Sequence, residues 1–136
     1  MTQSGRMADW TVRVYYEDTD AGGVVYHASY LRYLERARTE WLRNLGYSQA
    51  QLKQEESLLF TVVSMQMDFL RPAKLDDLLS VHSDARIAGG ASVQFSQRVL
   101  RGDETLLTAE VRVACLEAGS FRPKRLPAAL RGALES

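Results

Sequence analysis

The order of hydrophobic and polar residues predicts two kinds of element in this chain. Residues 10–16 alternate between the two classes, which is typical of a half-buried strand. From about Ala28 to Leu45 the hydrophobic residues recur every three or four positions instead, which predicts an amphipathic helix with a wide aromatic face. Gly46 is suited to end this helix in a left-handed conformation. Ser48 and Gln51 have the spacing of a capping box and predict a second, shorter helix.

Beyond residue 62 the period of the pattern is two. Gly89-Gly90 and Gly102-Asp103 interrupt the alternation and are typical of hairpin turns. Short turns join only antiparallel neighbours, so the later strands are expected to form an antiparallel sheet. These strands cover residues 63–69, 79–87, 93–99 and 107–115. The tail after residue 120 is interrupted by prolines, and we expect it to cross the surface and end in a short helix.

This order of elements predicts an α+β protein with two layers, an antiparallel sheet wrapped around one long helix. The chain has 136 residues, the length of one domain, so we treat 1–136 as a single domain. A sheet this small has edge strands that need cover, and pairing between two copies would supply it. We therefore expect a homodimer, or a homotetramer built from two such dimers.

Composition excludes several classes of protein. Lys+Arg and Asp+Glu both number 17, so the net charge gives no reason to expect nucleic acid as a partner. The single cysteine, Cys115, excludes an internal disulfide and a cysteine-rich metal centre, and we expect it to be an unreactive core residue. Residues 1–10 lack the apolar segment of a signal peptide, and no run approaches the ~18 apolar residues of a membrane span. We expect a cytoplasmic protein.

The segment YYEDTDAGGVVYHASY, residues 15–30, is the main candidate for chemistry. It places Glu17, Asp18 and Asp20 within four positions, just before Gly22-Gly23. A structural turn explains the residue types, although it does not require three acids that repel one another. A calcium loop would need further spaced carboxylates, and a zinc site would need more His or Cys ligands. A phosphate-binding loop would need a lysine and a hydroxyl residue that this segment lacks.

A catalytic loop is the other interpretation of this segment. Asp20 lies about eight residues ahead of the predicted helix, whose first amides offer free N–H groups and positive potential. If the GGVVY run folds back, those amides and the carboxylate face the same space. A carboxylate that attacks or activates water, opposite amides that hold an oxyanion, suits acyl transfer. The residues alone leave the structural and the catalytic interpretation open.

The run VYYEDTDAGGVVYHASYLRYLERARTEWL resembles the hotdog-fold acyl-CoA thioesterases of the 4-hydroxybenzoyl-CoA thioesterase family. Within it, the chain is most similar to the bacterial branch associated with the Tol-Pal cell-envelope system. FLRPAKLDDLL and RPKRLP extend the resemblance over nearly the whole chain. It implies the hotdog fold, in which an antiparallel sheet of five to six strands wraps around a central helix. It also implies hydrolysis of acyl-CoA to free acid and CoA, with no metal and no cofactor.

The resemblance implies roles for individual residues. Asp20 matches the catalytic acid of the family, acting as nucleophile or as general base, and Asp18 then has a structural role. His27 and Tyr16 support activity, and the backbone N–H near His27 polarises the thioester carbonyl. The 4-hydroxybenzoyl branch has Asp-Pro-Ala-Gly where this chain has Asp20-Ala21-Gly22, and a tyrosine at the position of His27. Specificity for that aromatic substrate is therefore not transferred, and we expect short- to medium-chain acyl groups instead.

Further residues are expected to bind the substrate. Beside the catalytic acid these are Gly22, Gly23 and Tyr26. In the family, the region that matches Val62, Val63 and Ser64 faces the pantetheine channel from the partner subunit. Basic residues at the channel mouth would meet the phosphates of coenzyme A, although each is equally consistent with a solvated surface charge. The candidates are Arg86, Arg122, Lys124 and Arg125.

Two other functions remain as alternatives to acyl-CoA hydrolysis. The same fold can bind acyl groups without turning them over, as a non-catalytic acyl-carrier or envelope-associated module. Acyl carrier protein is then a candidate partner, and it is also an alternative carrier of the substrate. A dehydratase of the same fold would need a characteristic motif that this chain does not contain. The remaining histidine, His82, lies on the polar side of its strand and is expected at the surface.

Overall fold

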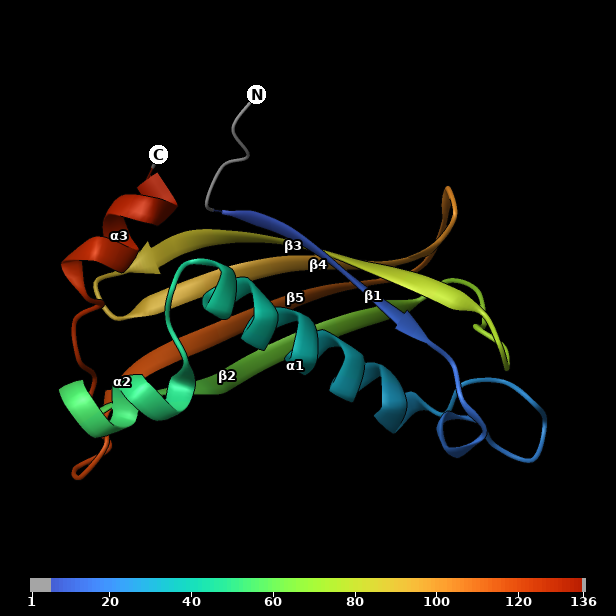
Figure 1. The fold of residues 1–136 in the computed structure, drawn as a ribbon, viewed down its shortest axis with the longest axis horizontal. Helices are drawn as coiled ribbons and strands as arrows, with labels where there is room; N and C mark the ends of the chain where they lie inside the picture. Colours follow the sequence, from blue (N-terminus) through green and yellow to red (C-terminus); the bar gives the residue numbers. More distant parts are fainter. Residues whose placement is uncertain (1–5, 136) are drawn as a thin grey trace.

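The computed structural model describes residues 6–135 (Figure 1). Two predictions concern residues outside this range in part. They are the single domain over 1–136 and the absence of a signal-peptide pattern in residues 1–10. The elements follow the predicted order of strand, long helix, short helix and four strands. They are β1 (Met7–Arg13), the 3-10 turn η1 (Tyr16–Asp18), α1 (His27–Asn44), α2 (Gln49–Glu56), β2 (Leu58–Phe69), β3 (Leu78–Gly89), β4 (Ser92–Arg101), β5 (Glu104–Glu117) and α3 (Ala128–Glu135).

The five strands form one antiparallel sheet in the order β1-β3-β4-β5-β2. Hairpins join β3 to β4 and β4 to β5, whereas both edge strands pair with a strand that is distant in the sequence. Helix α1 lies across one face of this sheet (Figure 1). This arrangement confirms the predicted α+β class and the antiparallel sheet around a long helix.

Helix α1 begins and ends within one residue of the prediction. Its hydrophobic face is buried, as the three- and four-residue spacing requires. Trp41 of this face meets Phe95 of β4 edge to face, with ring centroids 4.9 Å apart. Gly46 ends the helix with φ +92°, a left-handed conformation that favours glycine. Each large side chain buried here stabilises the fold by about 1.5–3 kcal/mol. The buried apolar residues of α1 are Tyr30, Tyr33, Leu34, Ala37, Trp41 and Leu42.

The prediction for the first strand is wrong at its end. The strand stops at Arg13, and the chain turns into η1 because the Asp18 side chain competes for the backbone. Asp18 Oδ2 accepts a hydrogen bond from the Tyr15 amide at 3.0 Å, and the Asp18 amide donates to the Tyr15 carbonyl at 3.0 Å. Tyr16 is therefore not a strand residue, and 80% of it is exposed.

Strand β2 is longer than predicted and is an edge strand. It begins at Leu58, and its register with β5 passes from Val62 directly to Ser64, so Val63 lies in a bulge. Val63 is 55% exposed and Phe69 is 48% exposed, although the alternation assigns both to the apolar face. No strand of the described chain pairs with the outer side of β2. This edge of the sheet therefore exposes apolar side chains to solvent.

The turns and smaller features largely follow the sequence. The β3–β4 turn consists of Gly90 and Ala91, one residue later than predicted. The Ser48 side chain accepts a hydrogen bond from the Gln51 amide, which confirms the cap of α2.

Cys115 is fully buried, and burial raises the pKa of its thiol to about 11. His82 is half-buried rather than free at the surface, with Nδ1 2.8 Å from a carboxylate oxygen of Asp9. Among the described residues, no helix combines the length and the hydrophobicity needed to span a membrane.

Candidate active site

The acidic loop, residues 15–26, contains a short hairpin that leads from β1 into α1. Thr19 and Val25 face each other in an isolated bridge. Inside it, the Asp20 amide donates to the Val24 carbonyl at 2.9 Å, and the Gly23 amide donates to the Asp20 carbonyl at 3.0 Å. Gly23 has φ +81°, which favours glycine at this position. The chain therefore folds back after Asp20, as the catalytic interpretation requires.

Asp20 is exposed at the tip of this hairpin. Its Oδ1 accepts a hydrogen bond from the Gly22 amide at 2.8 Å. A Cβ atom at position 22 would lie 3.3 Å from the same oxygen, so the absence of a side chain on Gly22 lets the carboxylate approach the backbone. Oδ2 has no hydrogen-bond partner among residues 6–135. One carboxylate oxygen is thus held in place, and the other is available to a ligand or to water.

Asp18 occupies the opposite environment, although it is only two residues away. It is 8% exposed, and its Oδ2 accepts the hydrogen bond from Tyr15 that starts η1. Its Oδ1 lies 3.9 Å from the Arg32 guanidinium of α1. The Asp18 carbonyl accepts a further hydrogen bond from the Tyr26 amide at 2.8 Å. Asp18 therefore ties the two ends of the acidic loop to each other and to α1.

The hydroxyl of Tyr33 lies near the buried carboxylate of Asp18. Burial raises the pKa of the Tyr33 hydroxyl well above its usual range, and the nearby Asp18 charge raises it further. The hydroxyl is close enough to be affected by that charge but has no partner that meets hydrogen-bond geometry. The tyrosine is therefore a neutral core residue beneath the loop, as its helical spacing predicts.

The N-terminus of α1 lies beside the acidic loop. His27 is the first residue of the helix, and Tyr26 precedes it without making a side-chain cap. Among residues 6–135 no side chain accepts from the first N–H groups of α1, and the Ser29 amide donates to the Tyr26 carbonyl at 2.9 Å. The His27 ring is exposed and packs on Phe69 of β2 with centroids 4.5 Å apart. The structure thus brings Asp20, Gly22, Gly23, Tyr26 and His27 into one region, with the exposed Tyr16 in the adjoining turn.

The predicted coenzyme A contacts lie elsewhere in the chain. Arg86 is near the end of β3 and pairs with Asp84 at 3.5 Å. The Lys124 ammonium donates to the carbonyl of Glu56, and Arg122 and Arg125 are exposed in the tail. These segments lie at the end of the molecule that carries α2 and α3, whereas the acidic loop lies at the opposite end (Figure 1). A single protomer therefore does not bring these basic residues to Asp20.

A pocket of about 260 Å³ lies between the second half of α1 and the sheet. None of the predicted catalytic residues lines it, whereas Val62 of the predicted substrate-binding residues does. Arg38 is the basic residue among those that line the pocket, and its Nη1 donates to Gln97 Oε1 at 2.9 Å. Burial lowers the pKa of Arg38. Apart from Arg38, Glu35, Gln49 and Thr61, the lining is apolar: Trp41, Leu42, Phe60, Val62, Val93, Phe95, Val113 and Leu130.

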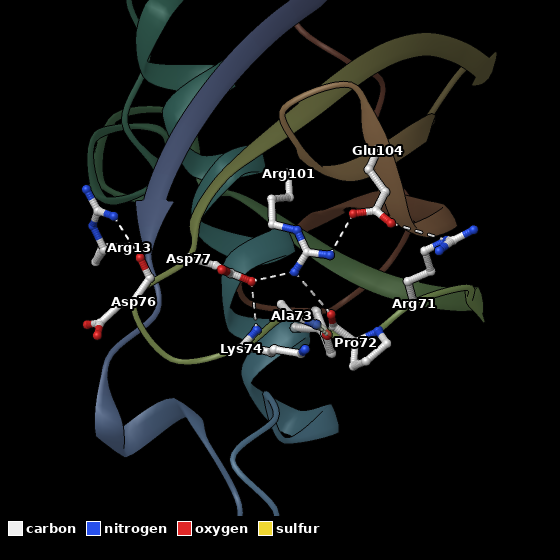
Figure 2. Close-up of polar contacts among 10 residues, drawn as sticks. Arg13, Arg71, Pro72, Ala73, Lys74, Asp76, Asp77, Arg101 and Glu104 are labelled. Atoms are coloured by element: carbon white, nitrogen blue, oxygen red, sulfur yellow. Dashed lines mark hydrogen bonds and ion pairs between the residues drawn. The ribbon is translucent and has the colours of Figure 1, made fainter.

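Residues 72–77, between β2 and β3, form a turn that we call the clamp turn (Figure 2). It holds the acidic loop on both flanks through backbone hydrogen bonds. The Val25 amide donates to the Ala73 carbonyl at 2.8 Å, and the Val14 amide donates to the Asp77 carbonyl at 2.9 Å. The Ala73 amide donates to the Tyr30 hydroxyl of α1 at 3.0 Å. The periodicity of the sequence did not reveal this role. The position of the β3–β4 turn could have revealed it, because extending the register of that hairpin brings Asp77 close to Arg101.

Comparisons with known proteins agree with this architecture. The sequence profile of the thioesterase superfamily matches residues 22–108. Acyl-CoA thioesterase YbgC of Haemophilus influenzae is 48% identical over 122 residues, which cover 90% of each chain. Acyl-CoA thioester hydrolase YbgC of Escherichia coli is 48% identical over 119 residues, 87% of this chain and 88% of the relative.

A solved structure extends the comparison to three dimensions. The crystal structure of a probable thioesterase from Bartonella henselae superposes with a TM-score of 0.84 at 40% identity, and the match covers 89% of this chain and 99% of that one. The profile match includes Gly22, Gly23, α1 and strands β2 to β4, and it begins two residues after Asp20. The chain belongs to the thioesterase superfamily and has its hotdog fold.

Proposed function

We propose that this protein is an acyl-CoA thioesterase that hydrolyses the thioester to a free acid and CoA, with Asp20 as its catalytic carboxylate. The observation that carries the proposal is the position of Asp20. One oxygen is fixed by the Gly22 amide, the other has no hydrogen-bond partner among residues 6–135, and the hairpin that carries Asp20 leads directly into the start of α1, where Tyr26 makes no side-chain cap. The similarity to acyl-CoA thioesterases over most of the chain supports the same activity.

The thioester carbonyl is placed against the first amides of α1, near His27. Those N–H groups and the positive end of the helix stabilise the oxyanion as it forms. Asp20 then acts by one of two routes. It attacks the carbonyl carbon and displaces the CoA thiolate, leaving a mixed anhydride that water opens, or it takes a proton from water that attacks directly. In both routes the C–S bond breaks, a proton reaches the thiolate and Asp20 is regenerated.

The surroundings support further parts of the proposal. His27 and Tyr16 orient the substrate or water, Tyr26 lines the site, and Gly22 and Gly23 let the backbone approach the thioester. A short- to medium-chain acyl group, carried by CoA or by acyl carrier protein, is the substrate that this proposal includes. Location in the cytoplasm and membership of the Tol-Pal-associated branch belong to the same proposal.

Assembly is a separate part of the proposal. The apolar outer edge of β2, with Val62, Val63 and Phe69 exposed, supports a homodimer formed along this strand, or a tetramer of two such dimers. Light scattering of the wild-type chain at micromolar concentration is expected to give at least twice the 15.3 kDa mass of the chain. Val63→Lys should shift that mass toward the monomer, since it puts a charge on the edge. A wild-type monomer would contradict the dimer.

The experiment that tests the activity is hydrolysis of short-, medium- and long-chain acyl-CoAs by wild type, Asp20→Asn and Glu17→Gln. Asp20→Asn should lower kcat by at least about a thousandfold, because neither nucleophile nor base remains, while the fold is retained. Glu17→Gln removes an exposed acid from the same loop and should keep wild-type turnover. Wild-type turnover by Asp20→Asn would overturn the assignment. An inactive wild type that still retains acyl carrier protein would favour the non-catalytic alternative.

A further inference from the structure

The clamp turn is held by the side chain of Arg101, which comes from the end of strand β4. Arg101, the last residue of β4, spreads its guanidinium across three acceptors (Figure 2). Nη1 donates to Asp77 Oδ2 at 2.6 Å and lies 3.4 Å from the Pro72 carbonyl, and Nη2 donates to Glu104 Oε1 at 2.6 Å. Arg101 thus contacts both ends of the clamp turn and the first residue of β5.

The bonds of Arg101 continue into the turn itself. Asp77 Oδ2, which accepts from Arg101, also accepts from the Lys74 amide at 2.9 Å. Although burial acts in the opposite direction, the Lys74 amide and Arg101 hold the pKa of Asp77 below its ordinary value. On the other side, Glu104 forms an outer ion pair with Arg71 at 3.3 Å. One guanidinium therefore joins the clamp turn to the β4–β5 hairpin.

The clamp turn in turn fixes the elements of the candidate site. It holds Val14, where the acidic loop leaves β1, and Val25, where the loop enters α1. Lys74 also faces Val24 in an isolated bridge, beside the Asp20 hairpin. Through Ala73 and Tyr30, the same turn is tied to the first turn of α1. A displacement of the clamp turn therefore moves Asp20 relative to the helix amides.

We propose that Arg101 is a positioning residue, which sets the placement of Asp20 against the N-terminus of α1 by holding the clamp turn. This inference rests on the proposed function. The planar guanidinium suits the task because it bonds Asp77 and Glu104 at the same time in a fixed geometry. A lysine has a compact ammonium without the fixed planar fork of the guanidinium, so it holds the two carboxylates less precisely. Displacing a reacting group by ~1 Å can cost about a hundredfold in rate.

The test compares Arg101→Gln, Arg101→Lys and Asp77→Asn with Arg98→Gln as the matched control. Arg98 lies on the same strand but is exposed and has no ion pair among the described residues. Arg101→Gln should lower kcat by about ten- to a hundredfold with KM within about twofold of wild type. Arg101→Lys should recover part of that loss, Asp77→Asn should resemble Arg101→Gln, and Arg98→Gln should match wild type.

Two further measurements separate positioning from a general loss of structure. Urea unfolding determines the folded fraction, and kcat is expressed per folded molecule. Hydrogen exchange of the Val25 and Val14 amides should become faster in Arg101→Gln and stay unchanged in Arg98→Gln. Unchanged kcat in Arg101→Gln, or a loss that vanishes when corrected for folded fraction, would overturn the inference. If Arg101→Gln does not fold, Arg101→Lys and Asp77→Asn decide by the same criteria.

The outcome is distinguishable from failure of the proposed function. If Asp20→Asn is inactive and Arg101→Gln is fully active, the positioning role fails and the thioesterase assignment stands. If Asp20→Asn keeps wild-type turnover, the assignment of Asp20 fails whatever the Arg101 variants do. An Arg101→Gln defect in kcat together with an inactive Asp20→Asn supports both.

Discussion

The two ends of helix α1 are held in place by different interactions. From Leu34 onward it is fixed by apolar packing, with Leu34 fully buried and Trp41 packed on Phe95 of the sheet. Its first turn is fixed by hydrogen bonds from the acidic loop and the clamp turn, while His27 and Tyr26 stay exposed. Burial supplies free energy but little direction, whereas hydrogen bonds define positions at a smaller net free energy. Substitutions at one end should therefore change stability, and those at the other should change activity.

The largest expected effect on stability comes from Leu34→Ala in the packed part of α1. Leu34 is fully buried, and its truncation should lower the free energy of unfolding by about 2–5 kcal/mol, measured by urea denaturation. The kcat per folded molecule should stay within about twofold of wild type. Leu31→Ala, at an exposed position of the same helix, serves as control. A large fall in kcat without loss of stability would remove the distinction between the two ends.

Asp18→Ala tests the hydrogen-bonded end. It removes a buried carboxylate that accepts from Tyr15 and faces Arg32, a change that should destabilise the loop by about 1.5–3 kcal/mol. The kcat should fall by about tenfold because the hairpin carrying Asp20 loses its anchor. Urea denaturation and steady-state kinetics check the two effects separately. Glu17→Ala, an exposed acid next to it, should change neither, and equal defects in both variants would argue against an anchoring role.

Acid should weaken the clamp turn through Asp77. Because the pKa of Asp77 in the folded protein lies below its ordinary value of 3.8, the stabilisation is complete above about pH 4 and is lost as the pH falls through the folded value. Asp77→Asn removes this contribution at neutral pH. The gap in urea midpoint between wild type and Asp77→Asn should therefore narrow between pH 7 and pH 3. A gap for Asp77→Asn that stays constant or widens in acid would contradict the sign.

The smallest expected effect comes from Gly22→Ala. The added Cβ would lie 3.3 Å from Asp20 Oδ1, so the carboxylate must shift by a few tenths of an ångström. We expect kcat to fall a few-fold, on the order of 1 kcal/mol in the activation free energy, with no measurable change in unfolding. Gly90→Ala is the matched control, since a Cβ there meets no atom within 4 Å. Wild-type kcat in Gly22→Ala would show that the Asp20 position tolerates such a shift.

The sequence predicts the regular elements better than the connections between them. Helix α1 and the strands after residue 78 follow from periodicity, because their buried faces repeat. The end of β1 does not, because the Asp18 side chain competes with the strand for the Tyr15 amide. The bulge at Val63 depends on pairing with β5, which no local pattern contains.

The candidate site is predictable where it is local in sequence. Asp20, Gly22, Gly23 and His27 lie within eight positions, and the structure places them in one region, although their roles remain predictions. The bond between Asp77 and Arg101 joins residues 24 positions apart and depends on strand register. The basic residues of the tail were assigned by charge alone, and charge does not say at which end of the sheet a segment lies.

The strand order has a consequence for how the chain reaches its fold. Only β3, β4 and β5 pair with their neighbours in sequence. Strand β2 pairs with β5, so it can join the sheet only after β3, β4 and β5 have been synthesised. During synthesis, α1 and the apolar β2 leave the ribosome before any strand that can pair with β2 exists. Local hairpins close faster than distant ones, so the meander of residues 78–117 should form first and recruit both edges. The edge strands β1 and β2 are therefore expected to be ordered after this meander, although both precede it in the chain.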